Sequence, residues 1–272
     1  MDIRQLARGT VAWERLERVA RTLAIRYDRD VVRVEFLDAN NWLSTPCVLD
    51  DEWFVKIVTA QNTRVHSLLT AGRNAGAITS GSGGFFDRFE TPLQMVEHEY
   101  DATVRIRELG CHAPRPIEAF EANGLGVLVL EYLPMFETID ELSPETVRRL
   151  APQLFEMLSK IHESGLAHGD IRAENLLWHD ETLYFIDATS VQEGRYSETR
   201  GYDLACALAV LEPRIGAREA VSMAAEHYSG EDLLTAREFL DFIRLRPDHA
   251  FDTTNLRSEV EKGVDLYANE EG

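Results

Sequence analysis

The amino-acid sequence predicts an α+β protein of two lobes, a small β-rich N-terminal lobe and a larger helical C-terminal lobe. Three observations support this prediction. Apolar and polar residues alternate over much of 31–58, which is the period of β-strands. Two further apolar runs, 117–121 and 127–132, flank Asn123-Gly124, a dipeptide typical of hairpin turns. In the second half of the chain, apolar residues recur at helical spacing in several successive segments.

The composition is acidic and poor in lysine. Asp and Glu number 47 against 28 Lys and Arg, which gives the 272-residue chain a net charge of −19. Only Lys56, Lys160 and Lys262 are lysines. Because concentrated salt screens repulsion between acids, this balance predicts a halophilic source, with an acidic protein from an ordinary source as the alternative. It argues against nonspecific nucleic-acid binding, which needs a basic surface.

The three cysteines and the lack of long apolar runs bear on location. Cys47, Cys111 and Cys206 are too scattered for a CxxC metal site, and they indicate a reducing compartment. The sequence has no apolar run of membrane-spanning length and no signal-peptide pattern. We therefore expect a soluble cytoplasmic protein without a membrane partner.

The N-terminal part of the chain is predicted to be one helix followed by three strands. Residues 1–30 form an N-terminal helical extension, because apolar residues recur at helical spacing among arginines. A packing helix is the simpler interpretation, and a partner-binding helix is the alternative. The N-lobe covers residues 31–130. Its first strands are expected around 32–36, 42–49 and 53–58, with turns at 38–41 and 50–51.

A polar, glycine-rich insertion at 59–91 separates these strands from the next helix, and we expect it to be flexible. Thr91-Pro92 begins that helix and Gly110 ends it. Glu99 shares a helical face with apolar residues, so its carboxylate is expected on the buried side. Glu97 is the alternative residue for the same role.

The C-lobe covers residues 131–272 and begins where the second apolar run of the hairpin runs into Pro134. Ser143-Pro144 is predicted to cap a long helix that ends at Gly165. Asp203 is interpreted as an N-cap and buried anchor of a later helix. Further helices are expected over about 216–268, with breaks near 229–230 and 246–247.

The segment Ala167-His168-Gly169-Asp170-Ile171-Arg172-Ala173-Glu174-Asn175 carries the chemistry. It is a short polar segment between apolar runs, and an apolar strand ending in Asp187 follows it. Phosphoryl transfer needs a carboxylate to orient the attacking hydroxyl and accept its proton, which we assign to Asp170. It also needs oxygen ligands for Mg²⁺, which we assign to Asn175 and Asp187. His168 is interpreted as a structural residue of the loop.

Lys56 lies between apolar neighbours inside the third strand. A strand lysine that faces solvent is the simpler interpretation. With the downstream loop in the same chain, we favour a lysine that holds nucleotide phosphates and pairs with the carboxylate of Glu99, or of Glu97.

These residues resemble the protein-kinase-like superfamily, and most of all its RIO branch of atypical protein kinases. Gly169 stands where most protein kinases carry arginine. The segment Ile186-Asp187-Ala188 resembles the metal-binding strand end of RIO proteins, and the insertion between the lysine strand and the glutamate helix is similar to theirs. The short spacing from Asp187 to Asp203 leaves little room for a peptide-binding segment. His168-Gly169-Asp170 is equally similar to aminoglycoside- and choline-type phosphotransferases and to the small kinases of tRNA-modifying complexes.

The resemblance implies a two-lobed kinase-like fold that uses ATP and Mg²⁺. It implies transfer of the γ-phosphate to a protein serine, or ATPase cycling, with Arg172 steadying the transferred phosphate. The hinge backbone at Glu131 and Leu133 would meet the adenine edge. RIO relatives also suggest a ribosome-associated partner. The alternatives are a phosphotransferase acting on a small-molecule hydroxyl, and a non-catalytic ATP-binding regulator, because the turn at 38–41 lacks glycine.

Overall fold

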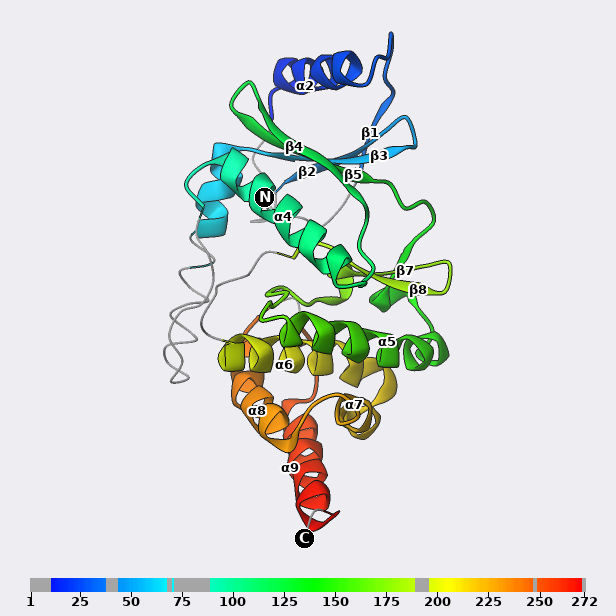
Figure 1. Cartoon of the computed structure of the whole chain (residues 1–272), viewed down its shortest axis with the longest axis vertical. Helices are drawn as coiled ribbons and strands as arrows, with labels where there is room; N and C mark the ends of the chain where they lie inside the picture. The colour runs from blue at the N-terminus through cyan, green and yellow to red at the C-terminus, as the bar shows by residue number, and fades with distance from the viewer. Residues whose placement is uncertain are drawn as a thin grey trace. The chain divides into compact units, whose positions relative to one another are not determined.

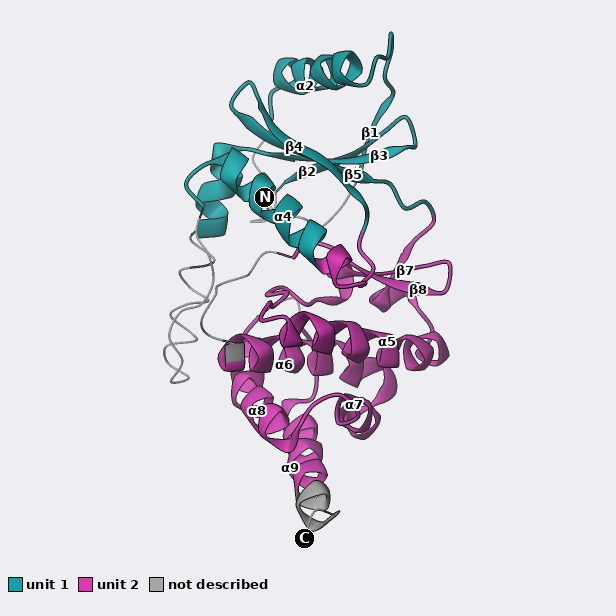
Figure 2. Ribbon diagram, viewed as in Figure 1, with its two compact units in different colours: residues 1–72, 88–105, 114–134 teal, residues 73–87, 106–113, 135–272 magenta. Residues whose placement is uncertain are grey.

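A computed structural model describes residues 11–37, 44–67, 70, 89–188, 196–246 and 249–270. The chain divides into two compact units (Figure 2). Unit 1 comprises residues 1–72, 88–105 and 114–134, and unit 2 comprises 73–87, 106–113 and 135–272. The fold class is the predicted α+β, with an antiparallel sheet in unit 1 and mostly helices in unit 2.

Unit 1 is built on a five-stranded antiparallel sheet with strand order β1-β2-β3-β5-β4 (Figure 1). Its strands are β1 (Val34–Phe36), β2 (Thr45–Leu49), β3 (Trp53–Val58), β4 (Pro116–Ala122) and β5 (Leu125–Glu131). The predicted hairpin turn has φ of 55° at Asn123 and 71° at Gly124. These left-handed angles match the twist of a tight hairpin and explain why Asn-Gly stands there.

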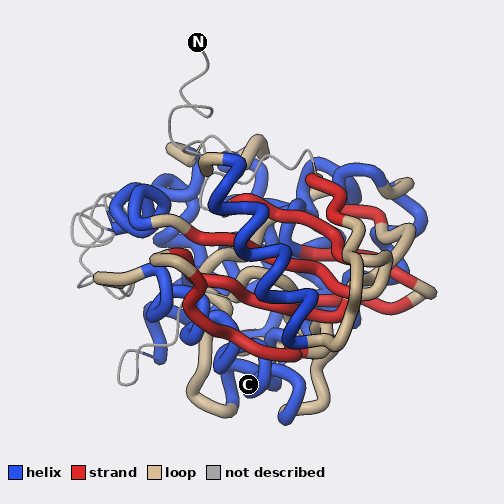
Figure 3. Tube along the Cα trace, turned by 90° about the horizontal axis from the view of Figure 1, so that it is seen from above, coloured by secondary structure: helices blue, strands red, loops and turns tan. Residues whose placement is uncertain are grey.

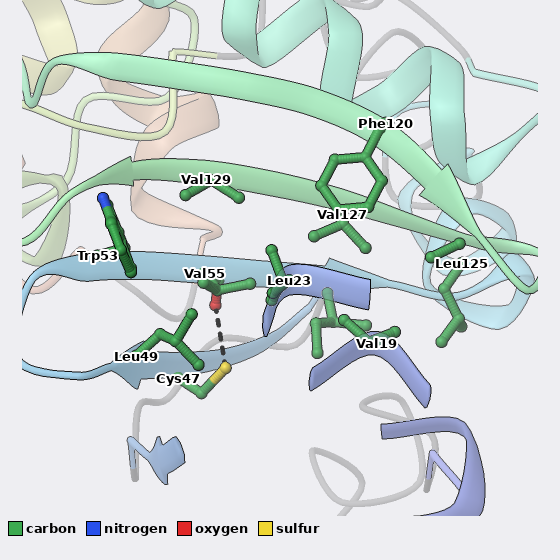
Figure 4. Close-up of a cluster of buried hydrophobic side chains, with 12 residues drawn as sticks. Val19, Leu23, Cys47, Leu49, Trp53, Val55, Phe120, Leu125, Val127 and Val129 are labelled. Atoms are coloured by element: carbon green, nitrogen blue, oxygen red, sulfur yellow. Dashed lines mark hydrogen bonds between the residues drawn. The ribbon is translucent and has the colours of Figure 1, made fainter. Parts of the chain in front are cut away.

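Helix α2 (Trp13–Arg26) covers one face of this sheet. Seen from above, a helix lies across the strands (Figure 3). Val19 and Leu23 point into an apolar cluster with side chains of β2, β3 and β5, including Val55 and Val127 (Figure 4). Residues 1–10 of the predicted extension lie outside the described residues. The helix is therefore a packing element of unit 1, in line with the simpler interpretation.

Helix α4 (Pro92–Glu108) covers the opposite face (Figure 1). Met95 and Val96 pack against Leu128 and Leu130, the alternate side chains of β5. The two helices thus account for the nearly continuous apolar character of β5, since both of its faces are buried. Gly126 allows the close approach, because a Cβ there would lie 2.3 Å from the carbonyl oxygen of Pro92.

The predicted flexible insertion 59–91 begins with a helix at residues 60–67. Its N-terminus is capped reciprocally by two buried residues. The Thr59 N–H donates to Asn62 Oδ1 at 2.9 Å, and the Asn62 N–H donates to Thr59 Oγ1 at 3.1 Å. Residues 71–88, which hold most of the glycines of the insertion, lie outside the described residues, as does the predicted turn at 38–41.

Unit 2 combines helices with a small three-stranded sheet of order β6-β7-β8. The helices are α5 (Pro144–Glu163), α6 (Tyr196–Ile215), α7 (Ala217–Ala224), α8 (Gly230–Arg244) and α9 (Thr253–Glu270). The strands are β6 (Glu137–Thr138), β7 (Leu176–His179) and β8 (Thr182–Phe185). Ser143 caps α5 as predicted, since its Oγ accepts the Thr146 N–H at 3.2 Å.

Asp203 corrects one element prediction. It lies inside α6 rather than at the start of a helix, so it is not an N-cap. It is fully buried, which agrees with the predicted role of an anchor. Among the helices described, none combines the length and the apolar character that crossing a membrane requires.

Candidate active site

The Lys56 ammonium group is buried in unit 1 and paired with a carboxylate. Lys56 lies on β3, which pairs with β2 on one side and β5 on the other. Its Nζ lies 2.9 Å from Glu99 Oε1 and 2.8 Å from Oε2, and both side chains are only 3% exposed. Glu97 is exposed on α4. Glu99 is therefore the partner, and Lys56 is not a solvent-facing strand lysine.

The hinge end of β5 presents backbone groups of Glu131 and Leu133. The Glu131 N–H donates to the carbonyl oxygen of Arg115 at 2.8 Å, and the Glu131 carboxylate accepts the Arg115 N–H at 3.0 Å. The amide N–H of Glu131 is thus used within the sheet. Leu133 is buried.

The predicted catalytic loop belongs to unit 2, between α5 and β7. Asp170 is 6% exposed and Asn175, at the end of a short 3-10 helix (Ala173–Asn175), is 2% exposed. Asn175 Nδ2 donates to the Asp170 carbonyl oxygen at 2.8 Å and to its Oδ2 at 3.3 Å. Arg172 Nε lies 3.2 Å from the same Oδ2. The structure therefore brings these three predicted residues together.

Asp203 holds the backbone of this loop. Its Oδ2 accepts the His168 N–H at 2.6 Å and its Oδ1 accepts the Gly169 N–H at 2.8 Å. Gly169 has a φ of 80°, in the left-handed region that side chains avoid. A glycine at this position thus lets both amide groups turn toward one buried carboxylate.

Asp187 follows β8 and is half-buried, with a left-handed φ of 58°. The preceding residue ties this strand end to the loop, because the Ile186 N–H donates to the Asn175 carbonyl oxygen at 3.1 Å. The two predicted Mg²⁺ ligands therefore lie on backbone segments joined by a hydrogen bond.

His168 is fully buried beneath the loop. Burial lowers its pKa from the ordinary value of 6.5, although the nearby Asp203 and Asp170 carboxylates act in the opposite direction. Its Nδ1 accepts the Asp170 N–H at 3.4 Å, which assigns the acceptor role to that nitrogen. A neutral imidazole that bonds to the backbone fits a structural residue.

Two residues of this site were not found from the sequence. Arg246, in the connection after α8, donates to Asp170 Oδ1 at 2.9 Å, and its guanidinium also contacts the Tyr202 hydroxyl. Arg246 lies 76 positions from Asp170 in the chain. No motif or periodic pattern predicts the contact, since it depends on how α6 and α8 pack.

The donor set suits Mg²⁺ bound together with a nucleotide. The Asp187 carboxylate and the Asn175 amide oxygen are hard oxygen ligands of the kind that Mg²⁺ prefers. Across the described ranges, no group of three or more His, Cys, Asp or Glu side chains could hold a metal ion by itself. Mg²⁺ is commonly held by one or two carboxylates together with waters and substrate phosphates, so two protein ligands fit this ion.

Comparisons with known proteins show which families the chain is similar to. Residues 87–199 match the RIO domain family. The chain is 27% identical over 103 residues to the KEOPS complex subunit Bud32 of Pyrococcus abyssi, covering 37% of this chain and 46% of the relative. It is 29% identical over 105 residues to the RIO-type serine/threonine-protein kinase Rio1 of Haloferax volcanii, covering 37% and 35%. It thus spans less than half the length of these relatives.

Two further matches are shorter or more distant. A probable bifunctional tRNA threonylcarbamoyladenosine biosynthesis protein of Methanosarcina mazei is 38% identical over 55 residues, which cover 20% of this chain and 10% of the relative. A solved complex of Neurospora crassa PAN2 with the PAN3 pseudokinase aligns at a TM-score of 0.40 and 12% identity, covering 83% of this chain and 57% of that one. A TM-score of this size carries no structural argument.

The α+β fold, the buried Lys–Glu pair and the Asp–Asn loop define a protein of the protein-kinase-like superfamily. Within that superfamily the chain is RIO-like, with similarity to the KEOPS complex subunit Bud32 and to the RIO-type kinase Rio1.

Proposed function

We propose that the protein is an ATP-dependent phosphotransferase that passes the γ-phosphate of ATP to a serine hydroxyl, or to water as an ATPase. The observation that supports this most is the state of Asp170. Its carboxylate is buried and held by Asn175, Arg172 and Arg246 on a loop anchored by Asp203. An oriented carboxylate of this kind is what the attacking hydroxyl needs.

Unit 1 would supply the nucleotide contacts. Lys56 would hold the α- and β-phosphates, with Glu99 fixing the ammonium group in the middle of the sheet. The Glu131 carbonyl and the Leu133 N–H would hydrogen-bond to the adenine edge. These assignments extend the RIO resemblance to this chain residue by residue.

Unit 2 would supply the groups for metal and hydroxyl. Asn175 and Asp187 would hold Mg²⁺, which neutralises charge on the phosphates when bound. Asp170 would accept a hydrogen bond from the attacking hydroxyl and then its proton at a carboxylate oxygen. Arg172, with a 21% exposed side chain, would turn its guanidinium to the transferred phosphate.

The length of the segment after Asp187 bears on which group accepts the γ-phosphate. The segment between Asp187 and Asp203 is short, which favours water or a small-molecule hydroxyl over an extended peptide. A small-molecule phosphotransferase is therefore the second candidate. Because the relative in Pyrococcus abyssi is named as a subunit of the KEOPS complex, we also propose that this chain works with partner proteins.

Labelled ATP tests the proposal. The purified protein is incubated with γ-³²P-ATP and Mg²⁺ in high KCl, and phosphate release and self-labelling are measured. Asp170→Asn should reduce turnover by about 100-fold or more, the contribution typical of a positioned proton acceptor. Asp180→Asn is the matched control, since this side chain is 91% exposed in the same unit.

The other outcomes separate the alternatives. Turnover that survives Asp170→Asn would contradict the proposed mechanism. A wild-type protein that binds ATP but never turns it over would instead be a non-catalytic regulator. Labelling of a hydroxyl-bearing small molecule, with no labelling of protein extract, would favour the second candidate.

A further inference from the structure

Two arginines contact the Asp170 carboxylate, and they differ in how firmly they are held. Arg172 comes from the loop itself and is shared, because its guanidinium also lies 3.4 Å from Glu174 Oε2 and from Asn175 Oδ1. Its side chain is 21% exposed. A half-buried arginine with several alternative acceptors can exchange partners at a lower cost than a fully buried one.

The Arg246 side chain is held more firmly than that of Arg172. Its side chain is 8% exposed, and its guanidinium bonds both Asp170 Oδ1 and the hydroxyl of Tyr202. Tyr202 is fully buried in α6, one residue before the Asp203 that anchors the loop backbone. Helix α6 thus fixes both the loop backbone and, through Tyr202 and Arg246, the carboxylate.

We propose that Arg246 is the positioning residue for Asp170, an inference that rests on the proposed function. The planar guanidinium holds Oδ1, so the orientation of the carboxylate is set by unit 2 itself before any substrate binds. Oδ2 then faces the reacting hydroxyl. Its contacts with Asn175, at 3.3 Å, and with Arg172, at 3.2 Å, are longer than the 2.9 Å hydrogen bond at Oδ1.

The two arginines therefore have different roles in the proposal. Arg246 acts through Asp170 and stays in place. Arg172 is released from the carboxylate and becomes available to the phosphate. The connection between α8 and α9, which no sequence pattern marks as functional, would therefore belong to the reacting site.

Steady-state ATP turnover of three variants tests this assignment. Arg246→Met should lower kcat by about 100-fold, because a displacement of the carboxylate by about 1 Å has an effect of that size. The KM for ATP should change by less than about twofold, because a residue that acts only through Asp170 affects turnover and not nucleotide binding. Arg246→Lys keeps a cation but loses the planar fork, so it should recover part of kcat. Arg244→Met, at an exposed position on the last turn of α8, should behave as wild type.

Unfolding by urea supplies a readout that does not need turnover. Arg246→Met should lower the midpoint much less in an Asp170→Asn background than in wild type, since it breaks the buried ion pair with Arg246 only when the carboxylate is present. Additive effects would mean that the pair is not formed and would overturn the assignment. So would an Arg246→Met protein that is folded and keeps wild-type kcat. A wild-type protein without turnover would refute the proposed function and with it a role of Arg246 in turnover.

Discussion

The ion pair of Lys56 and Glu99 places two opposite charges inside an otherwise apolar layer. Both side chains lie on the face of the sheet that α4 covers, beside Val58 and Val96. Removing two charges from water is costly unless each satisfies the other. The stability of unit 1 should therefore depend strongly on keeping the pair complete.

Replacing Glu99 by Gln should destabilise the protein by about 3–5 kcal/mol, the typical cost of breaking a buried ion pair by neutralising one of its members. Urea unfolding followed by circular dichroism measures the change. Glu97→Gln is the control on the same helix, and because Glu97 is exposed its effect should stay within about 0.5 kcal/mol. Similar midpoints for the two variants would refute the argument from burial.

Glu118 links pH to the packing of α2 on the sheet. Burial raises the pKa of its carboxyl group, but hydrogen bonds from Arg26 and Tyr27 together lower it below the ordinary 4.5. A carboxyl group with a lowered pKa in the folded state stabilises that state above its unfolded pKa, and the contribution is lost as pH falls through the folded value.

We therefore expect stability to fall as the pH drops from about 4.5 downward, and Glu118→Gln to make this fall shallower. The effect should stay below about 1 kcal/mol, because Arg26 has a 44% exposed side chain and solvent screens the pair. Urea midpoints measured at pH 6, 4.5 and 3.5 test the sign. A steeper acid loss in the variant would contradict it.

Residues within short motifs could be predicted, and residues joined by distant contacts could not. Asp170, Asn175 and Asp187 follow one another closely in sequence, and the helical face of Glu99 could be read from its apolar neighbours. Arg246 meets Asp170 only because α8 packs on α6. Periodicity places a residue on a face of its own helix, but it does not say which loop that helix end will reach.

At the scale of elements, α4 can pack closely on β5 because position 126 of β5 is a glycine. Gly126 on β5 faces the first turn of α4, and a Cβ at Gly126 would come within 2.7 Å of the Pro92 carbonyl carbon. A backbone group cannot rotate away as a side chain can. The position of α4, and of the glutamate it carries, depends on this contact.

Gly126→Ala should therefore destabilise the protein by about 2 kcal/mol or more, as overpacking against backbone does. Gly263→Ala makes the same chemical change within α9, where the nearest atom would be 3.4 Å away in Val221. That control should be neutral or stabilising by up to about 1 kcal/mol, because alanine favours a helix interior. Urea midpoints of both variants give the comparison, and a neutral Gly126→Ala would show that α4 can shift freely.

Element boundaries were predicted best where a capping or turn residue marks them. Ser143-Pro144 and Thr91-Pro92 each mark the start of a predicted helix, with the proline as its first residue, and Asn123-Gly124 forms the hairpin turn. The sequence analysis does not predict the helix at 60–67, because Thr59 and Asn62, which cap it, lie in a segment whose polar and glycine-rich composition is typical of a linker. Asp203 was assigned to a helix start, although buried contacts place it in a helix interior.

At the scale of the whole molecule, the net charge of −19 makes self-repulsion the dominant long-range force. The described surface pairs arginine with acids at many places, including Arg29–Glu52 and Arg148–Glu219. With 47 acids and 28 bases, most of the excess must stay unpaired. Repulsion among these acids falls once salt shortens the screening length.

Raising KCl from 0.1 M to 2 M should therefore increase the melting temperature by several degrees, since the screening length shrinks from about 10 Å to below about 3 Å. Differential scanning calorimetry measures the shift, and an uncharged osmolyte at equal osmolality is the control. A melting temperature that falls with KCl would mean that ion pairs outweigh repulsion.

The backbone conformation of Gly169 bears on how this loop could diverge. Its φ of 80° is tolerated by glycine and strained for a residue with a Cβ. Adopting the arginine that most protein kinases carry there would require the peptide groups around Asp203 to be rebuilt at the same time. A single substitution of Gly169 by arginine would therefore leave a strained backbone at this position, so the two types of loop must differ in more than one residue.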